Sequence, residues 1–169
     1  MEKVTLNFQY SKKEYIDAFR LYLFQSKIIR KFDFILIGIL SMIEVLLLLW
    51  SGISIYSIVT GIILGFYCLL FTIMYYYQPG NVYKHNPKLR QTYQLIFFPD
   101  KILFKTNGVS SDLKWDIYHE ILSSDRFYFL IQSKQVFTIL PKRALTNKSD
   151  VKNFEKMIAH NHITLKNFA

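Results

Sequence analysis

Two long apolar runs stand close together in this chain of 169 residues and constrain its fold more than any other feature. Residues 34–50 contain one side chain that is charged at neutral pH, Glu44, and residues 53–77 contain none. As helices they would be about 26 and 37 Å long, and the hydrocarbon core of a bilayer is about 30 Å thick. Only two residues separate the runs, so the sequence predicts a two-helix transmembrane hairpin over residues 32–78.

The charges that flank the hairpin predict its orientation. Cations precede the first run and follow the second, whereas the connecting residues carry no charge; these cations are Lys27, Arg30, Lys31, Lys84, Lys88 and Arg90. Because cytoplasmic flanks are rich in Lys and Arg, we expect a multi-pass protein of a bacterial cell membrane with both termini in the cytoplasm. A signal peptide is the less favoured alternative, since no small-residue cleavage site follows the first run.

The formal net charge of +9 would suit either nucleic acid or an anionic membrane surface. The excess cations lie on the two pieces that flank the hairpin, where each nearby cation adds about 1 kcal/mol of attraction to an anionic leaflet. No motif that reads RNA or DNA is present. We therefore expect membrane lipids, and another membrane protein or peptide, as partners rather than nucleic acid.

Glu44 needs its own explanation, because a carboxylate at the centre of a span costs about 2.5–3.5 kcal/mol. One explanation is an ion or proton relay. The other, which we favour because the second run has no charged partner, is a polar contact inside the hairpin or between protomers of a homo-oligomer. Counted from the turn, Glu44 lies at the depth of Thr60 and Gly61, and Gly61 with Gly65 forms a GxxxG motif that permits close helix packing.

The segments outside the hairpin alternate between apolar and polar residues, as strands do. Residues 1–31 are expected to form a cytoplasmic strand at 4–10 and then a helix, which a capping box at Ser11 and Glu14 opens. The apolar stripe of that helix could rest on the bilayer or pack on protein; it consists of Tyr15, Ile16, Phe19, Tyr22 and Leu23.

Residues 84–169 are expected to form a cytoplasmic domain. Strands are predicted over 93–97, 101–106, 113–118, 127–132 and 136–140, with an Asn107-Gly108 hairpin turn and a helix from Ser149 to Asn161. The predicted fold is therefore α+β: a transmembrane hairpin plus a small β-barrel or curled sheet capped by a C-terminal helix. The strand at 4–10 is expected to complete that sheet, because an isolated strand leaves its backbone groups without partners.

The sequence lacks the patterns that enzymes use. It has one cysteine, Cys68, no Cys/His spacing typical of zinc, no glycine-rich phosphate loop and no nucleophile paired with a base. We expect a non-enzymatic protein with no catalytic residue, metal or cofactor.

Two interpretations remain open for Pro141-Lys142-Arg143. In the structural one, Pro141 ends a strand and the two cations are solvated. In the functional one, Lys142 and Arg143 contact lipid headgroups or an acidic partner, together with Lys84, Lys88 and Arg90.

The basic N-terminal strand and helix, the two-span hairpin, and the motifs Trp115-Asp116-Ile117-Tyr118 and Pro141-Lys142-Arg143-Ala144 resemble the YcxB-like family of Gram-positive bacterial membrane proteins. The resemblance implies a C-terminal part similar to pleckstrin-homology (PH) domains. It also implies a first functional expectation, since some membrane-anchored proteins of that type give immunity to bacteriocins. We therefore expect a protein that protects against a membrane-active bacteriocin. The alternatives are a membrane adaptor or regulator that binds a membrane protein or anionic lipid, and a transporter or channel component.

Overall fold

The computed structural model describes residues 2–133 and 136–168 and consists of two compact units. The residues up to Ala18 group with those from Asn86 onward, and we call this part the sheet unit. Residues Phe19–His85 form the second part, which we call the helical unit. The sequence predicts three consecutive segments, 1–31, 32–78 and 84–169. The compact units instead join the first part of the chain to the last, and the boundary between them falls inside helix α1 (Lys12–Gln25).

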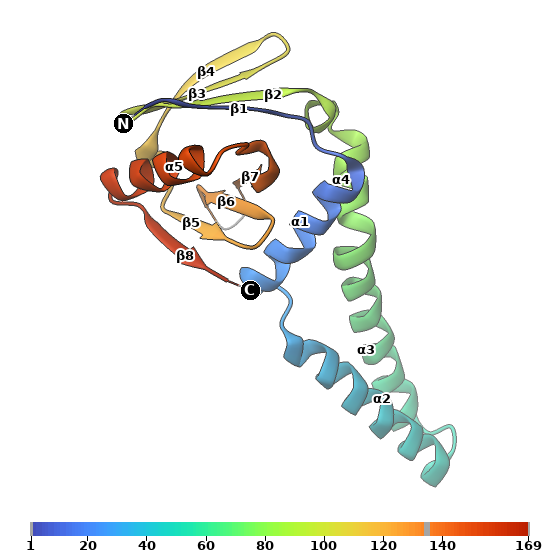
Figure 1. Ribbon diagram of the computed structural model, residues 1–169. Coiled ribbons are helices and arrows are strands. Elements are labelled where there is room, and N and C mark those ends of the chain that lie inside the picture. The colour runs from blue at the N-terminus through green and yellow to red at the C-terminus, as the bar shows by residue number, and fades with distance from the viewer. Residues whose placement is uncertain (1, 134–135, 169) are drawn as a thin grey trace. The chain divides into compact units, whose positions relative to one another are not determined.

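The described residues of the sheet unit form two four-stranded sheets (Figure 1). The first is fully antiparallel and runs β1 (Val4–Phe8), β2 (Tyr93–Phe97), β3 (Lys101–Thr106) and β4 (Val109–Lys114). The second runs β7 (Phe137–Pro141), β6 (Phe127–Ile131), β5 (Glu120–Ser123) and β8 (Thr164–Asn167), and β8 is parallel to β5.

Strand β1 pairs with β2 although the whole helical unit separates them in the sequence. In this antiparallel pair Leu6 lies opposite Leu95 and Phe8 opposite Tyr93, and all four side chains are buried. The predicted pairing of the N-terminal strand with the C-terminal sheet is therefore confirmed. Because period-2 alternation puts one side of β1 into the core, the segment before the hairpin is part of the domain that follows it.

Helix α5 (Lys148–His160) lies between the two sheets and joins their cores (Figure 1). The ring of Phe154, which is fully buried, lies 4.8 Å from that of Phe97 in the first sheet and 5.3 Å from that of Tyr128 in the second. Trp115 packs on Phe97 and donates its indole N–H to the carbonyl of Phe98 at 2.8 Å. This aromatic cluster lies in the core of the sheet unit, and the predicted C-terminal helix is confirmed.

The expected single barrel or curled sheet is replaced by two sheets, neither of which closes. The alternation at 113–118 suggested one strand, but β4 ends at Lys114 and a 3-10 turn, η3 (Trp115–Ile117), carries the chain into the second sheet. Strand β5 gave no alternating pattern because its central residues are buried on both faces, and β8 is too short and polar to predict. Gly108, the second residue of the Asn107-Gly108 turn, has φ +80°, a conformation that glycine adopts readily. Lys134 and Gln135, in the other predicted turn, lie outside the described residues.

The helical unit contains two helices that are long and apolar enough to cross a membrane. The first is α2 (Lys31–Ser51); the second is continuous over Ile55–His85 and comprises α3 (Ile55–Thr72), the π-helical turn η1 (Ile73–Tyr77) and α4 (Gln78–His85). The buried share of their most apolar stretches is 0% and 6%. A core helix of a soluble domain would bury its apolar side chains, so these two helices lack the environment that such a helix needs.

The second helix extends past the predicted end at residue 77 because the π-helical turn accommodates Pro79. Proline has no N–H for the carbonyl four residues earlier, which here belongs to Tyr75. Arg20 donates its Nε–H to that carbonyl at 3.2 Å, and its guanidinium lies 4.7 Å from the centroid of the Tyr75 ring. The bond that proline removes is thus replaced from α1, and the helix continues.

We predict that Leu6→Ala lowers the free energy of unfolding of the sheet unit by about 2–4 kcal/mol, because it leaves a cavity opposite Leu95. Thr5→Ala, on the exposed side of the same strand, should change it by less than about 0.5 kcal/mol. Urea unfolding of the full chain in detergent micelles, followed by Trp115 fluorescence in a Trp50→Phe background, measures both. Equal effects of the two substitutions would contradict the pairing.

Candidate functional site

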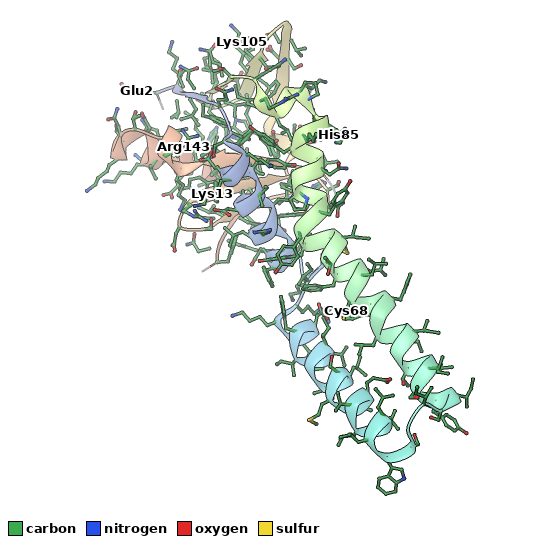
Figure 2. All side chains as sticks on the ribbon, turned by 90° about the vertical axis from the view of Figure 1, so that its right-hand side faces the viewer. Glu2, Lys13, Cys68, His85, Lys105 and Arg143 are labelled. Carbon is green, nitrogen blue, oxygen red and sulfur yellow. The ribbon has the colours of Figure 1, made fainter. Side chains whose placement is uncertain are left out.

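A cleft of about 420 Å³ opens on the sheet unit where the start of α1, the turn between β5 and β6, and the 3-10 turn η4 (Lys142–Ala144) meet. We call it the junction cleft. Nine residues line it, and seven of them are charged: Ser11, Lys13, Glu14, Asp17, Asp125, Arg126, Phe127, Lys142 and Arg143. Figure 2 shows Lys13 and Arg143 as neighbours in this region.

Arg143 is held in place by three hydrogen bonds. Its Nε and Nη2 donate to the two carboxylate oxygens of Glu14 at 2.7 and 2.8 Å, and Nη2 also donates to the carbonyl of Gln9 at 2.9 Å. The ion pair raises the pKa of Arg143. Glu14 was expected to complete a capping box, and Ser11 does accept the backbone N–H of Glu14 at 3.1 Å, but the carboxylate binds Arg143. Arg143 therefore ties η4 to the junction of β1 and α1.

A second, looser ion pair crosses the same cleft. Both terminal nitrogens of Arg126 lie 3.4 Å from one carboxylate oxygen of Asp17. The acid of this pair, Asp17, is 26% exposed, whereas Glu14 in the tighter pair is 15% exposed; the two arginines are similarly exposed. The two pairs together neutralise the two acidic residues that α1 contributes to the cleft.

Lys142 is fixed differently. Its ammonium lies 4.5 Å from the ring centroid of Tyr128, and its backbone N–H donates to the carbonyl of Arg126 at 2.9 Å. Tyr128 in turn donates its hydroxyl to Glu155 at 3.0 Å. Burial, reinforced by Glu155, raises the pKa of Tyr128, so the ring remains neutral and its face attracts the ammonium.

Three charged side chains of the cleft lack an ion pair among the residues that the structure describes. They are Lys13 on α1, Asp125 in the β5–β6 turn and Lys142 on η4. The cleft therefore combines two internally neutralised pairs with two available cations and one available acid.

Buried tyrosines support the elements that form the cleft. Tyr10 donates its hydroxyl to the carbonyl of Ile139, and its ring lies 6.2 Å from that of Tyr15 on α1. Burial raises the pKa of Tyr15 to about 12, and the pKa of Tyr10 well above its ordinary value. These phenols are neutral at physiological pH and act as packing groups. Of the predicted α1 stripe, Tyr15, Tyr22 and Leu23 are buried, whereas Ile16 and Phe19 are only partly buried.

The other predicted contact residues lie on two elements. Lys88 and Arg90 are exposed on the 3-10 turn η2 (Pro87–Arg90), and Lys84 is exposed on α4 of the helical unit. The side-chain amide of Gln9 donates to the backbone carbonyl of Arg90, and the backbone carbonyl of Gln9 accepts from Arg143. The backbone of Arg90 and the side chain of Arg143 therefore both bond to Gln9, but neither Lys88 nor Arg90 lines the junction cleft.

Of the four predicted packing residues of the hairpin, Glu44, Thr60 and Gly61 lie together and Gly65 does not. The hydroxyl of Thr60 bonds to Oε2 of Glu44, and a Cβ added to Gly61 would lie 3.2 Å from Oε1. Glu44 thus contacts the second helix inside the hairpin, where Gly61 leaves room for its carboxylate. Gly65 has no atom within 4 Å of such a Cβ, so it takes no part in this contact.

Sequence reasoning missed Lys13, Glu14, Asp17, Asp125 and Arg126 as members of the cleft. Arg126 and Asp17 are 109 positions apart, and the charges of α1 looked like an ordinary solvated helix start. The available signal was the predicted pairing of the N-terminal strand with the C-terminal sheet, which brings the start of α1 onto the domain. No group of three or more His, Cys, Asp or Glu side chains in the described part of the chain could hold a metal ion.

Comparison with known proteins identifies one part of the chain. Residues 97–158 match the family model described as YcxB-like protein. This part of the chain is similar to the YcxB-like family. The match runs from the end of β2 into α5, and it includes Arg126, Lys142 and Arg143, while β1, α1 and the hairpin lie outside it. No curated protein and no solved structure matches the chain.

We predict a coupling energy of about 1 kcal/mol between Arg143 and Glu14, because their pair is bidentate and one partner is largely buried. A double-mutant cycle with Arg143→Ala and Glu14→Ala, measured by urea unfolding in micelles, gives this value. The matched cycle on Arg126 and Asp17 should give a clearly smaller coupling, and equal couplings would show that the bidentate geometry adds nothing.

We predict that Glu44→Gln preserves the thermal stability of the helical unit, since an amide can still bond to Thr60 beside Gly61. Glu44→Leu should lower it or change the oligomeric state, because the Thr60 contact is lost. Melting temperature and size-exclusion chromatography in detergent measure both effects. Loss of a biological phenotype in a stable Gln variant would instead support a proton or ion role.

Proposed function

We propose that this protein is a non-enzymatic, membrane-anchored binding module, in which a two-span hairpin holds the sheet unit at the cytoplasmic face of a bacterial cell membrane. The observation that carries this proposal is the pairing of β1, before the hairpin, with β2, after it. Two strands of one sheet must lie on the same side of a membrane, which two crossings permit and one does not.

The exposed apolar helices support a membrane environment, because water would otherwise face both of them. Cleavage of α2 as a signal peptide is disfavoured for a structural reason. It would remove β1, whose Val4, Leu6 and Phe8 are buried in the sheet unit. The cations on both flanks of the hairpin favour the cytoplasmic side for that unit.

The order of strands supports a PH-like organisation. Strands β1–β4 form an antiparallel meander, β5–β7 form a second one, and α5 packs between the two sheets. In this interpretation the hairpin is an insertion between the first and second strands, and β8 is an addition after the helix. We therefore propose that the sheet unit has a PH-like fold and that the junction cleft is its binding surface.

The geometry favours an adaptor or regulator, because the open cleft presents Lys142 and Arg143, whose side chains are held in place before any partner binds. Protection against a membrane-active bacteriocin is the form that the family resemblance implies. A transporter role has less support, since Glu44 is engaged with Thr60 within the hairpin. Sensitivity of a deletion strain to a panel of bacteriocins, with complementation by the wild-type gene, separates protection from a general adaptor role.

We predict that a cysteine at Ile53, in the turn of the hairpin, reacts with an impermeant maleimide in intact cells. Cysteines at Lys3 and Lys88, on the two flanks, should react only after permeabilisation, because both segments belong to the sheet unit. A Cys68→Ser background removes the native thiol. Reaction of Lys3→Cys or Lys88→Cys in intact cells would defeat the proposed topology.

A further inference from the structure

We propose that the junction cleft binds a monoanionic phosphodiester that carries free hydroxyl groups, as a glycerophosphoglycerol unit does. This inference deepens the proposed function. It rests on that function only where the ligand is a membrane lipid, because a lipid ligand requires the sheet unit to lie at the membrane. The same chemical group occurs on an anionic phospholipid and on a free water-soluble phosphodiester, and the experiment below separates these sources.

The available donors of the cleft point to an anion. Glu14 and Asp17 are already paired with Arg143 and Arg126, so they do not compete for the remaining cations. Lys13 and Lys142 have no ion pair in the described part of the chain, and both line the same hollow. Two ammonium groups from separate elements can therefore converge on one ligand group, with charge-assisted hydrogen bonds.

Two of the donors of the cleft are also positioned in advance. Lys142 is held over the ring of Tyr128, and Arg143 is fixed by Glu14 and Gln9 with its Nη1 unused in these bonds. A site whose side chains are already ordered loses less conformational entropy when it binds. This order distinguishes Lys142 and Arg143 from the exposed lysines of α5, whereas Lys13 is an exposed side chain on α1.

Charge balance selects the kind of anion. The cleft has four cationic and three acidic side chains, an excess of one positive charge. A phosphodiester carries one negative charge and balances that excess, whereas a phosphomonoester carries about −1.5 to −2 at pH 7 and exceeds it. The unpaired carboxylate of Asp125 would repel a dianion, but it can accept hydrogen bonds from the hydroxyl groups of a polyol.

The test uses the full chain in maltoside micelles, which contain no phosphorus. Titration of glycerophosphoglycerol, followed by its ³¹P NMR signal, measures the free phosphodiester; glycerol 3-phosphate and glycerophosphocholine are the dianionic and zwitterionic comparators. Native mass spectrometry of protein from mixed micelles measures retention of phosphatidylglycerol against phosphatidylcholine. Retention of phosphatidylglycerol with no binding of the soluble compound identifies a lipid, and equal binding of both identifies the phosphodiester group itself.

We expect Lys13→Gln with Lys142→Gln to weaken the binding of the preferred probe by about tenfold or more. The matched control, Lys148→Gln with Lys152→Gln, removes the same charge from exposed positions of α5 and should change binding by less than about twofold. Lys13→Gln alone, at an exposed position, should weaken binding severalfold without altering the melting temperature. Asp125→Asn should improve glycerol 3-phosphate relative to glycerophosphoglycerol.

The inference is overturned if neither glycerophosphoglycerol nor phosphatidylglycerol binds, or if the α5 control loses as much affinity as the cleft variant. It is also overturned if a polyglutamate peptide binds the cleft more tightly than glycerophosphoglycerol and phosphatidylglycerol do. The last outcome would assign the cleft to an acidic protein segment. Failure of phosphodiester binding leaves the labelling pattern of the hairpin untouched. Conversely, a wrong labelling pattern with intact binding of the soluble probe would refute the membrane topology alone.

Discussion

The antiparallel pairing of β1 with β2 is the interaction on which the rest of the sheet unit depends. It places Val4, Leu6 and Phe8 in the core and sets the start of α1 beside η4. Without it the first sheet would lose an edge strand, and the junction cleft would lose the wall that Ser11, Lys13, Glu14 and Asp17 provide. A chain segment that precedes the two apolar helices is therefore structural for the domain that follows them.

The same arrangement explains the distribution of charge in the cleft. Acidic groups on α1 meet basic groups on the β5–β6 turn and η4, and the pairs Glu14–Arg143 and Asp17–Arg126 hold these elements together. Pro141-Lys142-Arg143 is thus partly scaffold: Pro141 ends β7 opposite Phe127, and Arg143 anchors η4. Lys142 lines the cleft and has no ion pair among the described residues. The structural interpretation therefore applies to Pro141 and Arg143, and the functional one to Lys142.

Local patterns predicted the parts of the fold that depend on local periodicity. The strands at 93–97 and 101–106, the turn at Gly108 and the face of α5 around Phe154 follow directly from alternation or helical spacing. The break between the two sheets escaped prediction, because Trp115 continues the alternation of β4 although it begins a 3-10 turn. The cleft escaped because its charged groups become neighbours only through β1, and the π-helical turn before Pro79 depends on a distant arginine, Arg20.

A disulfide across β1 and β2 tests the pairing most directly. Thr5 and Ile96 are register partners, and opposite residues of an antiparallel pair are about 4.5–5.5 Å apart, within the range of a disulfide. In a Cys68→Ser background, Thr5→Cys with Ile96→Cys should form a cross-link under mild oxidation in membranes, detected by mass spectrometry of the joined peptides. Thr5→Cys with Gln94→Cys, displaced by two residues, should not. Failure of the first pair to cross-link, or equal cross-linking of both pairs, would contradict a sheet built from both sides of the hairpin.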